Sequence, residues 1–236
     1  MSDLTHKTAL VTGASSGMGL AITQNLLAQN CRVVGIARDF FKADLHHALF
    51  EPYQQDLSKL KQSADLIKQL CKTNTFDFFI HSAGSGLFGS IEQFSISQID
   101  EHIKLNLTSA LVISHYIVPG MRKKKSGRIV FIGSESALSA GKKGVLYSSA
   151  KFGLRGLSQS LREDCSKDGI AVSLINPGMV RTSFFDEQKF KPGILPSNAL
   201  AASDIAKTIL HVLHSSPDMV FDEINLSPRN KSIDFS

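Results

Sequence analysis

The sequence has few cysteines and no long apolar run. Its three cysteines, Cys31, Cys71 and Cys165, show neither a paired nor a metal-type spacing, so we expect no disulfide framework and no thiolate metal site. No apolar run reaches the length of a membrane span, and the first residues lack the basic-then-apolar order of a secretory signal. We therefore expect a cytoplasmic protein without membrane attachment and without a bound metal.

The sequence also lacks internal repeats, low-complexity tracts and Pro/Gly-rich linkers. Its 236 residues, 42% hydrophobic and 20% charged, suit one α/β domain with a substantial core. The net charge of +5 includes the basic run Arg122–Lys125. Because no aromatic residues interleave that run, we interpret it as a solvated loop rather than a nucleic-acid site. The expected organisation is a single domain over residues 1–236, with no nucleic-acid partner.

Candidate strands and helices alternate along the chain. Strands are predicted at Thr8–Val11, Arg32–Ala37, Phe50–Gln54, Phe76–His81, Gly127–Gly133, Ala171–Pro177 and Met219–Asn225, and helices at Met18–Gln29, Leu57–Cys71, Ile96–Met121, Tyr147–Lys167 and Ala202–Ser215. This alternation predicts an α/β, doubly wound parallel sheet (a Rossmann fold) of about seven strands with helices on both faces. Ligands of such sheets bind beyond the carboxyl ends of the strands.

A glycine-rich turn, Thr12–Gly19, joins the first predicted strand to the first predicted helix. Gly13 permits a tight turn, Gly17 permits close approach of a ligand, and Gly19 lets the helix pack on the sheet. The helix N-terminus then offers unpaired N–H groups and the positive end of its dipole to an anion. With a strand before it and a helix after it, the turn indicates nucleotide binding rather than a loop with chance glycines.

Four polar residues are candidates for chemistry. Tyr147 and Lys151 lie four residues apart at the start of a helix and so share one face. An ammonium group near a phenol lowers the pKa of the phenol, which makes Tyr147 a candidate general acid/base. Ser134 follows the strand Gly127–Gly133, at the ligand-binding edge of the sheet. Asn106 lies inside a predicted helix, where propensity does not favour asparagine.

In order and spacing, these features resemble those of the short-chain dehydrogenase/reductase family, single-domain and with a Tyr-x-x-x-Lys pair, from about residue 5 to residue 226. The matching positions are Thr12–Gly19, Ala83-Gly84, Asn106, Ser134, Tyr147 with Lys151, Asn176-Pro177-Gly178 and Thr182.

The resemblance implies a role for each polar residue. Tyr147 would exchange a proton with the substrate oxygen, and Ser134 would hydrogen-bond that oxygen. Lys151 would hold the nicotinamide ribose and depress the pKa of Tyr147. Asn106 would anchor a water relay that resupplies the proton. The expected activity is interconversion of a small-molecule carbonyl and an alcohol, with hydride supplied by the cofactor; the alternative is a non-catalytic NAD(P)-binding sensor or scaffold.

The resemblance also implies the cofactor contacts. These are Gly13, Ser15, Ser16, Gly17, Met18, Gly19, Arg38, Asp56, Ala83, Gly84, Tyr147, Lys151, Pro177, Gly178, Val180 and Thr182. NAD-binding members carry an acidic residue at the end of the second strand, where this chain has Ala37 followed by Arg38. Because a guanidinium suits a 2′-phosphate, we expect NADP (NADPH) rather than NAD. Asp39, one step further, would weaken this expectation if the register were different.

Other segments depart from the family pattern or leave alternatives open. His81-Ser82 stand where the family usually has two asparagines, and the remaining histidines are interpreted as structural or surface residues. Residues 183–200 are expected to form a substrate lid whose aromatic side chains favour an apolar or bulky substrate; ordinary packing of these side chains is equally compatible with the pattern. A homodimer or homotetramer is expected, although Ser227–Ser236 lacks the family's glycine-rich end.

Overall fold

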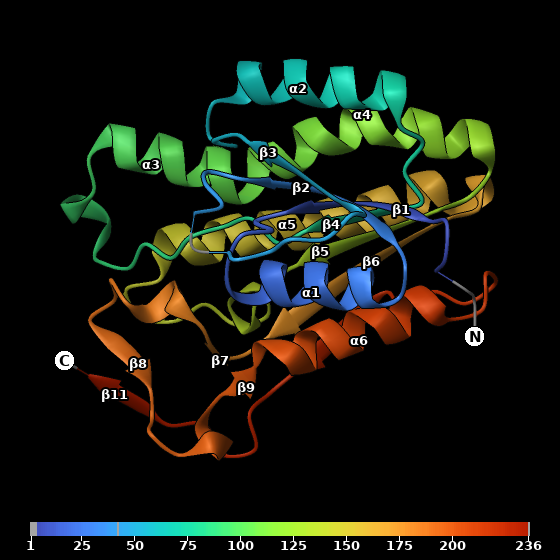
Figure 1. Ribbon diagram of the computed structural model, residues 1–236. Helices are drawn as coiled ribbons and strands as arrows, with labels where there is room; N and C mark the ends of the chain where they lie inside the picture. The colour runs from blue at the N-terminus through green and yellow to red at the C-terminus, as the bar shows by residue number, and fades with distance from the viewer. Residues whose placement is uncertain (1–3, 42, 236) are drawn as a thin grey trace.

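A seven-stranded parallel sheet with helices on both faces forms the centre of the molecule (Figure 1). The computed structural model describes residues 4–41 and 43–235. The strands lie in the order β10-β6-β5-β4-β1-β2-β3. Their bounds are β1 Thr8–Thr12, β2 Arg32–Ala37, β3 Phe50–Gln54, β4 Phe78–His81, β5 Gly127–Ile132, β6 Ile170–Pro177 and β10 Glu223–Leu226. The predicted doubly wound fold is confirmed.

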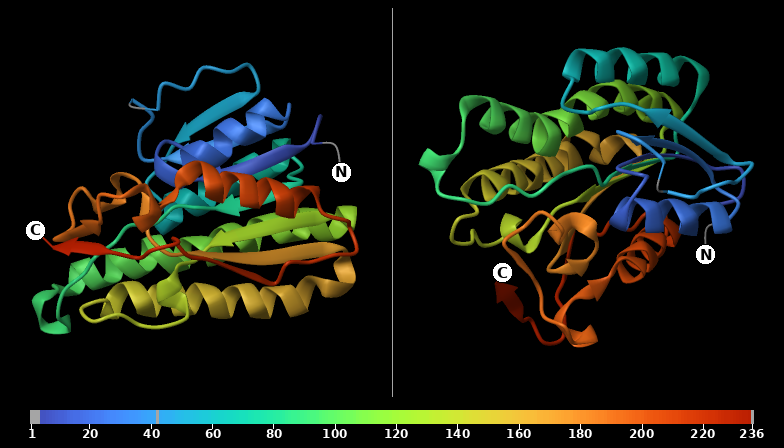
Figure 2. Two further views of the ribbon diagram at one scale, coloured as in Figure 1. Left: turned by 90° about the horizontal axis from the view of Figure 1, so that it is seen from below. Right: turned by 60° about the vertical axis from the view of Figure 1, so that its left-hand side comes forward.

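Helices cover the two faces of the sheet. The helices α1 (Gly17–Ala28) and α6 (Ala202–His214) pack side by side on one face, as Figure 2 also shows. The other face carries α2 (Leu60–Thr73), α4 (Ser109–Lys124) and α5 (Val145–Cys165). None of the helices in the described part of the chain combines the length and apolarity that a membrane crossing requires.

Alternate side chains of the central strands pack into two separate hydrophobic cores, one on each face of the sheet. On β1, Ala9 and Val11 pack with the α1 and α6 side, whereas Leu10 packs with the α2, α4 and α5 side. Successive side chains of a strand point to opposite faces, so a strand covered on both faces must be apolar throughout. This requirement explains why β1 reads as a continuous apolar run in the sequence.

The predicted helix Ile96–Met121 is interrupted in the structure. It consists of α3 (Ile96–Ile103), a π-helical turn over Lys104–Thr108, and α4. Inside the π turn, the Asn106 Nδ2 group donates to the His102 carbonyl at 3.1 Å, the acceptor that a regular α-helix would give to the Asn106 backbone N–H. The side chain thus replaces a backbone hydrogen bond, and π turns of this kind recur at functional sites.

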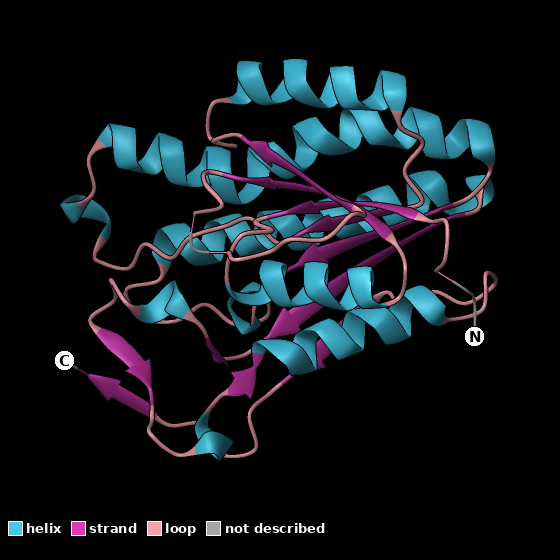
Figure 3. Ribbon diagram, in the orientation of Figure 1, coloured by secondary structure: helices cyan, strands magenta, loops and turns pink. Residues whose placement is uncertain are grey.

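The segment that follows β6 forms short strands, and the C-terminal strand pairs with one of them. There β7 (Val180–Arg181) pairs with β9 (Leu200–Ala201), and β8 (Phe190–Pro192) pairs antiparallel with β11 (Ile233–Phe235). The β8–β11 pair lies outside the central sheet, on the side to which the carboxyl ends of the central strands point (Figure 3). The segment 183–200, expected as a lid, therefore contains short strands, and the C-terminal strand β11 pairs with one of them.

Replacement of Phe79 by Ala should destabilise the protein strongly. Phe79 is 0% exposed on β4 and its ring contacts that of Phe131 edge-on, with 6.0 Å between centroids. Truncation of a buried phenylalanine costs about 3–5 kcal/mol through lost burial and a residual cavity. Denaturant unfolding measures the change, with Phe41→Ala as control because Phe41 is 94% exposed. Equal stability losses in the two variants would contradict the assignment of Phe79 to the core.

Candidate functional site

The candidate site lies where the strand order of the sheet reverses. The strands β2 and β3 lie on one side of β1 in the sheet, whereas β4, β5, β6 and β10 lie on its other side. The carboxyl ends stay level, since Thr12 pairs with His81 and His81 pairs with Phe131. Open parallel sheets bind ligands at such a switch point. The register thus gathers the residues that follow β1, β4, β5 and β6 at one edge.

The glycine turn between β1 and α1 forms a close backbone cradle. Gly13 adopts a φ of +68° and Gly17 a φ of +52°, values that suit glycine. A Cβ atom on Gly19 would lie 2.1 Å from the Gly13 carbonyl oxygen, so only glycine fits there. Ser16, the N-cap of α1, makes no side-chain cap hydrogen bond. The Ser16 side chain therefore leaves the first backbone N–H groups of α1 without a capping hydrogen bond. Such N–H groups at a helix N-terminus are suited to bind an anion.

A cleft of about 440 Å³ opens above this cradle. Most of the predicted cofactor residues line it: Gly13, Ser16, Gly17, Met18, Gly19, Arg38, Ala83, Gly84 and Thr182. Tyr147, Pro177, Gly178 and Val180 line a second cavity of about 130 Å³, which Met18 and Thr182 share. Ser15, Asp56 and Lys151 line neither. Most of the predicted set is thus brought to two adjoining cavities.

Arg38 projects at the end of β2, and in the described part of the chain it forms no ion pair. Ala37, the last residue of β2, is buried and offers no carboxylate. Asp56 lies close enough for the charge of Arg38 to act on it: burial pushes the Asp56 pKa up, but hydrogen bonds from Ser58, with Lys59 and Arg38, hold it below its ordinary value. The guanidinium remains available at the rim of the cleft.

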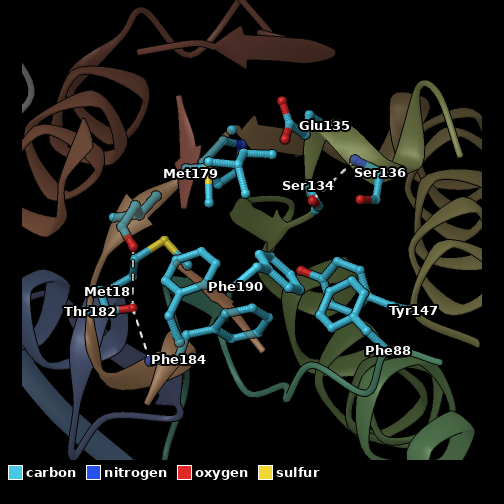
Figure 4. Close-up of a pocket in the computed structure, with 16 residues that line it drawn as sticks. Met18, Phe88, Ser134, Glu135, Ser136, Tyr147, Met179, Thr182, Phe184 and Phe190 are labelled. Atoms are coloured by element: carbon cyan, nitrogen blue, oxygen red, sulfur yellow. Dashed lines mark hydrogen bonds between the residues drawn. The ribbon is translucent and has the colours of Figure 1, made fainter. Parts of the chain in front are cut away.

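Aromatic side chains surround the second cavity (Figure 4). The Phe88 ring lies 5.2 Å from the Tyr147 ring, and the Phe184 ring lies 5.8 Å from it, centroid to centroid. Phe190 lies 4.9 Å from Phe88. Phe184 also lines the glycine cleft, so it stands between the two cavities. The resulting wall is mostly apolar. Ser134, Ser136 and Tyr147 form a polar side, and Thr182 lies on the opposite side, beside Met18.

Ser134 and Tyr147 supply two hydroxyl groups to that polar side. Burial raises the pKa of Tyr147 to about 12, while the hydrogen bond with the Ser134 side chain acts in the lowering direction. The structure differs here from the sequence-based expectation that Lys151 lowers this pKa. The Lys151 Nζ atom lies over the Tyr147 ring, 5.6 Å from its centroid, and in the protein by itself desolvation dominates.

Lys151 is nearly fully buried behind Tyr147. Only 5% of the residue is exposed, and its ammonium donates to the Ile132 carbonyl at 2.9 Å. Burial lowers the pKa of Lys151 to about 8, because desolvation disfavours the charged form. The predicted i, i+4 pair therefore exists on one face of α5, in a low-dielectric environment.

The Asn106 side chain lies near the buried Lys151 ammonium group. Its Oδ1 atom accepts from the Ser85 backbone N–H at 3.2 Å, and a Cβ atom on Gly84 would lie 2.7 Å from that oxygen and 3.7 Å from the Lys151 Nζ atom. Asn106 thus ties the loop after β4 to the π turn. Ser134, Tyr147, Lys151 and Asn106 come together as the sequence predicts.

Ser134 is positioned by a network that the sequence analysis did not identify. The Asn176 Oδ1 atom accepts from the Ser134 N–H at 3.2 Å, and the Asn176 Nδ2 group donates to Glu223 at 2.8 Å. The Arg155 guanidinium pairs with the same carboxylate at 3.0 Å. A Cβ atom on Gly133 would collide with the Asn176 Oδ1 atom at 2.1 Å. The network links β5, β6, β10 and α5 around one backbone amide.

Two buried histidines lie near Lys151: His102, which the sequence analysis interprets only as a structural or surface residue, and His81, which departs from the family pattern. His102 is 4% exposed, and its ring lies 6.3 Å from that of Tyr147. Its place four residues before Asn106, one turn earlier on the same helix, is the signal that could have identified it. Burial, followed by the charge of Lys151, lowers the pKa of His102 to about 4 and that of His81 to about 3.

His81, which stands where the family usually has an asparagine, contacts the end of β1. The Thr12 hydroxyl accepts from the Ser82 and Ala83 N–H groups, both at 3.1 Å. Its one proton is therefore free to be donated to the His81 Nδ1 atom, 3.0 Å away. A neutral imidazole thus joins β4 to β1. Within the described ranges, no group of three His, Cys, Asp or Glu side chains is placed to hold a metal ion.

The two buried histidines should make the protein acid-sensitive. Their folded-state pKa values lie below the ordinary 6.5, so the stability that is complete above pH 6.5 is lost as the pH falls toward the folded values. Each histidine should cost about 2 kcal/mol of unfolding free energy at pH 5. Urea unfolding at pH 7 and pH 5 tests this. His102→Gln should reduce the difference in unfolding free energy between pH 7 and pH 5 by about that amount, whereas His46→Gln, at an exposed position, should leave this difference unchanged. A His102→Gln variant with the same difference as the native chain would contradict the assignment.

Comparisons with known proteins agree with this architecture. The family model described as short chain dehydrogenase matches residues 7–192. An uncharacterized oxidoreductase of Staphylococcus saprophyticus is 28% identical over 97% of this chain and 100% of its own, and one of Staphylococcus aureus is 29% identical over the same shares.

Solved structures share the fold closely. A metagenomic short-chain oxidoreductase in complex with NADP is 26% identical with a TM-score of 0.82, over 98% of this chain and 100% of that one. An alcohol dehydrogenase of Thermococcus sibiricus, 22% identical with a TM-score of 0.85 over 96% and 98%, shows the same fold. This chain belongs to the short-chain dehydrogenase family of oxidoreductases.

Proposed function

We propose that the protein is an NADP-dependent oxidoreductase that interconverts a ketone or aldehyde and an alcohol, with Tyr147 as general acid/base. The observation that carries this proposal is the arrangement at the carboxyl edge of the sheet. The Ser134 and Tyr147 hydroxyls interact in the wall of one cavity, Lys151 is buried behind them, and the glycine cleft adjoins them. A protein that only binds a nucleotide has no need of a proton donor at this point.

The residues present fit a dinucleotide. The positive φ of Gly13 and Gly17 and the close approach at Gly19 leave a cradle without side chains, and the α1 N-terminus suits a pyrophosphate. Arg38 would hold a 2′-phosphate, and Thr182 with Val180 would hold the nicotinamide end. When bound, the cofactor would supply or accept a hydride. The related metagenomic oxidoreductase, whose structure contains NADP, supports this choice.

The chain's own residues would handle the proton. With its pKa raised to about 12, Tyr147 carries its proton at neutral pH, the state that carbonyl reduction requires. Ser134 would hydrogen-bond the same carbonyl oxygen and stabilise the developing charge. Asn106 and Lys151 close off the buried side, where Lys151 would hold the ribose and Asn106 a relay water.

The cavity walls favour an apolar substrate. Phe88 and Phe184 lie beside the Tyr147 ring, and Phe190 packs on Phe88, so an apolar group beside the carbonyl would replace water against these rings. Residues 183–200, which carry two of these phenylalanines, would act as the lid that excludes water during the reaction.

Tyr147→Phe should abolish turnover while cofactor binding persists. Loss of a general acid costs roughly two to four orders of magnitude in rate, and the hydroxyl is not the main anchor for the cofactor. NADPH oxidation with a panel of ketones and aldehydes gives the rate, and fluorescence titration gives NADPH affinity. Phe152→Tyr, on an exposed part of the same helix, is a matched control. Near-native turnover in Tyr147→Phe would exclude Tyr147 as the acid, and NADPH binding without turnover of any compound in the native chain would favour a sensor.

The native chain should prefer NADPH to NADH by about ten- to a hundredfold, since charge-assisted hydrogen bonds contribute about 1.5–3 kcal/mol each. The double variant Ala37→Asp with Arg38→Val should reverse the preference, because the new carboxylate repels a 2′-phosphate and accepts from a free ribose hydroxyl. Dissociation constants of both cofactors for both proteins provide the test. Equal binding by the native chain, or an unchanged preference without Arg38, would show that the phosphate is held elsewhere.

A further inference from the structure

A third cavity, of about 570 Å³, adjoins the Tyr147 cavity on its outer side. The two share part of their walls, namely Phe88, Glu135, Ser136, Phe190 and Ile233. We call this outer cavity the vestibule. Because the shared residues line both spaces, a molecule whose carbonyl lies against Tyr147 can extend past Phe88, Phe190 and Ile233 into the vestibule.

The vestibule is basic. Four lysines line it, Lys142, Lys143, Lys189 and Lys231, against two acidic residues, Glu135 and Glu187. Lys231 is already paired, with its Nζ atom 2.7 Å from Glu135. The other three lysines make no ion pair within residues 4–41 and 43–235. The vestibule therefore has an excess of positive charge that no described protein group neutralises.

Backbone contacts fix the basic loop in this place. The Gly89 N–H donates to the Lys143 carbonyl at 2.7 Å, and Gly89 bridges to Gly144. Lys143 holds a φ of +59°, a conformation that costs energy for a residue with a side chain. The loop that carries Lys142 and Lys143 is thus attached to the segment that carries Phe88.

The C-terminal strand builds the opposite wall. β11 pairs with β8 in register, with Phe235 opposite Phe190, and the Gly193 N–H donates to the Ser232 carbonyl at 3.0 Å. Asn198 on the lid donates to the Asn230 carbonyl at 2.6 Å. Through these bonds Ile233 reaches both cavities, although it lies 86 residues along the chain from Tyr147.

We propose that the vestibule binds an anionic group on the substrate, so that the substrate class is a carbonyl compound with an apolar body and a negatively charged end. This rests on the proposed carbonyl reductase activity. The apolar body contacts Phe88, Phe190 and Ile233, and the anion lies among Lys142, Lys143 and Lys189. Lysine ammonium groups act as flexible point charges, so they accommodate a carboxylate or a phosphate at the end of chains of differing length.

Matched substrates with and without the charge test the proposal. We expect the ratio of kcat/KM for ω-oxooctanoate to that for octanal to fall about five- to tenfold when Lys142, Lys143 and Lys189 are all changed to Gln, and to fall similarly at high salt. Octanal itself should be reduced as before. The control changes three lysines of α2, Lys61, Lys68 and Lys72, to Gln. These lysines are exposed and do not line the vestibule, so the ratio should stay unchanged. Glu187→Gln should raise the ratio.

A binding measurement separates this proposal from the proposed activity. Octanoate, which cannot be reduced, should bind the NADP⁺ complex in calorimetry, and the triple Lys→Gln variant should bind it about five- to tenfold more weakly. Octyl phosphate in the same titration shows whether a phosphate is preferred to a carboxylate. Equal loss of octanal and ω-oxooctanoate reduction, or unchanged octanoate binding, would overturn the anionic site. Failure of octanal reduction with normal, lysine-dependent octanoate binding would count against the reductase activity and leave the anionic site supported.

A separate variant tests whether Ile233, in the wall formed by the C-terminal strand, contacts the apolar body of the substrate. Ile233→Ala should lower kcat/KM for octanal and for ω-oxooctanoate by a similar factor, since it removes apolar contact from both and no charge from either. A selective effect on the charged substrate, or no effect on either, would exclude Ile233 from contact with the apolar body.

Discussion

The parallel register of β1, β4, β5 and β6 is the constraint on which the candidate site depends. Parallel strands need crossover helices, so the segments that leave their carboxyl ends meet at one edge although they are far apart in the sequence. At this edge the glycine turn, the loop after β4, Ser134 and the segment after β6 face one another. The Asn176 side chain then fixes the Ser134 amide against β6, so the position of one hydroxyl rests on the pairing of neighbouring strands.

Desolvation sets the electrostatics of this edge. Lys151, Tyr147 and His102 are all removed from water, and each shifts toward its neutral form: the lysine and histidine pKa values fall and the tyrosine pKa rises. A carbonyl at Ser134 would meet a protonated phenol in a low-dielectric pocket. In such a pocket each hydrogen bond to a developing charge has a larger effect than it would have in water.

The C-terminal strand β11 contributes to the cavity walls without being part of the central sheet. β11 adds to the short strand β8 rather than to the central sheet, so its side chains reach the cavities while the core stays as it is. Lys231 on this segment pairs with Glu135, the residue after Ser134. The tail is thus bonded to both walls of the pocket, and in our proposal it shapes the space in which the substrate is held.

The sequence alone determined the alternation of strands and helices, the glycine turn and the Tyr147–Lys151 pair, because periodicity, turn chemistry and i, i+4 spacing are local properties. The place of Ser134 beside Tyr147 followed only from the resemblance to the family. It did not predict the π turn at Asn106, which depends on the His102 carbonyl within the helix and on a backbone amide in the loop after β4. Only the tertiary structure decided the direction of the Tyr147 pKa, the burial of His102, and the pairing of β11 with β8. Each of these depends on solvent exclusion or on contacts between distant segments, which no local pattern encodes.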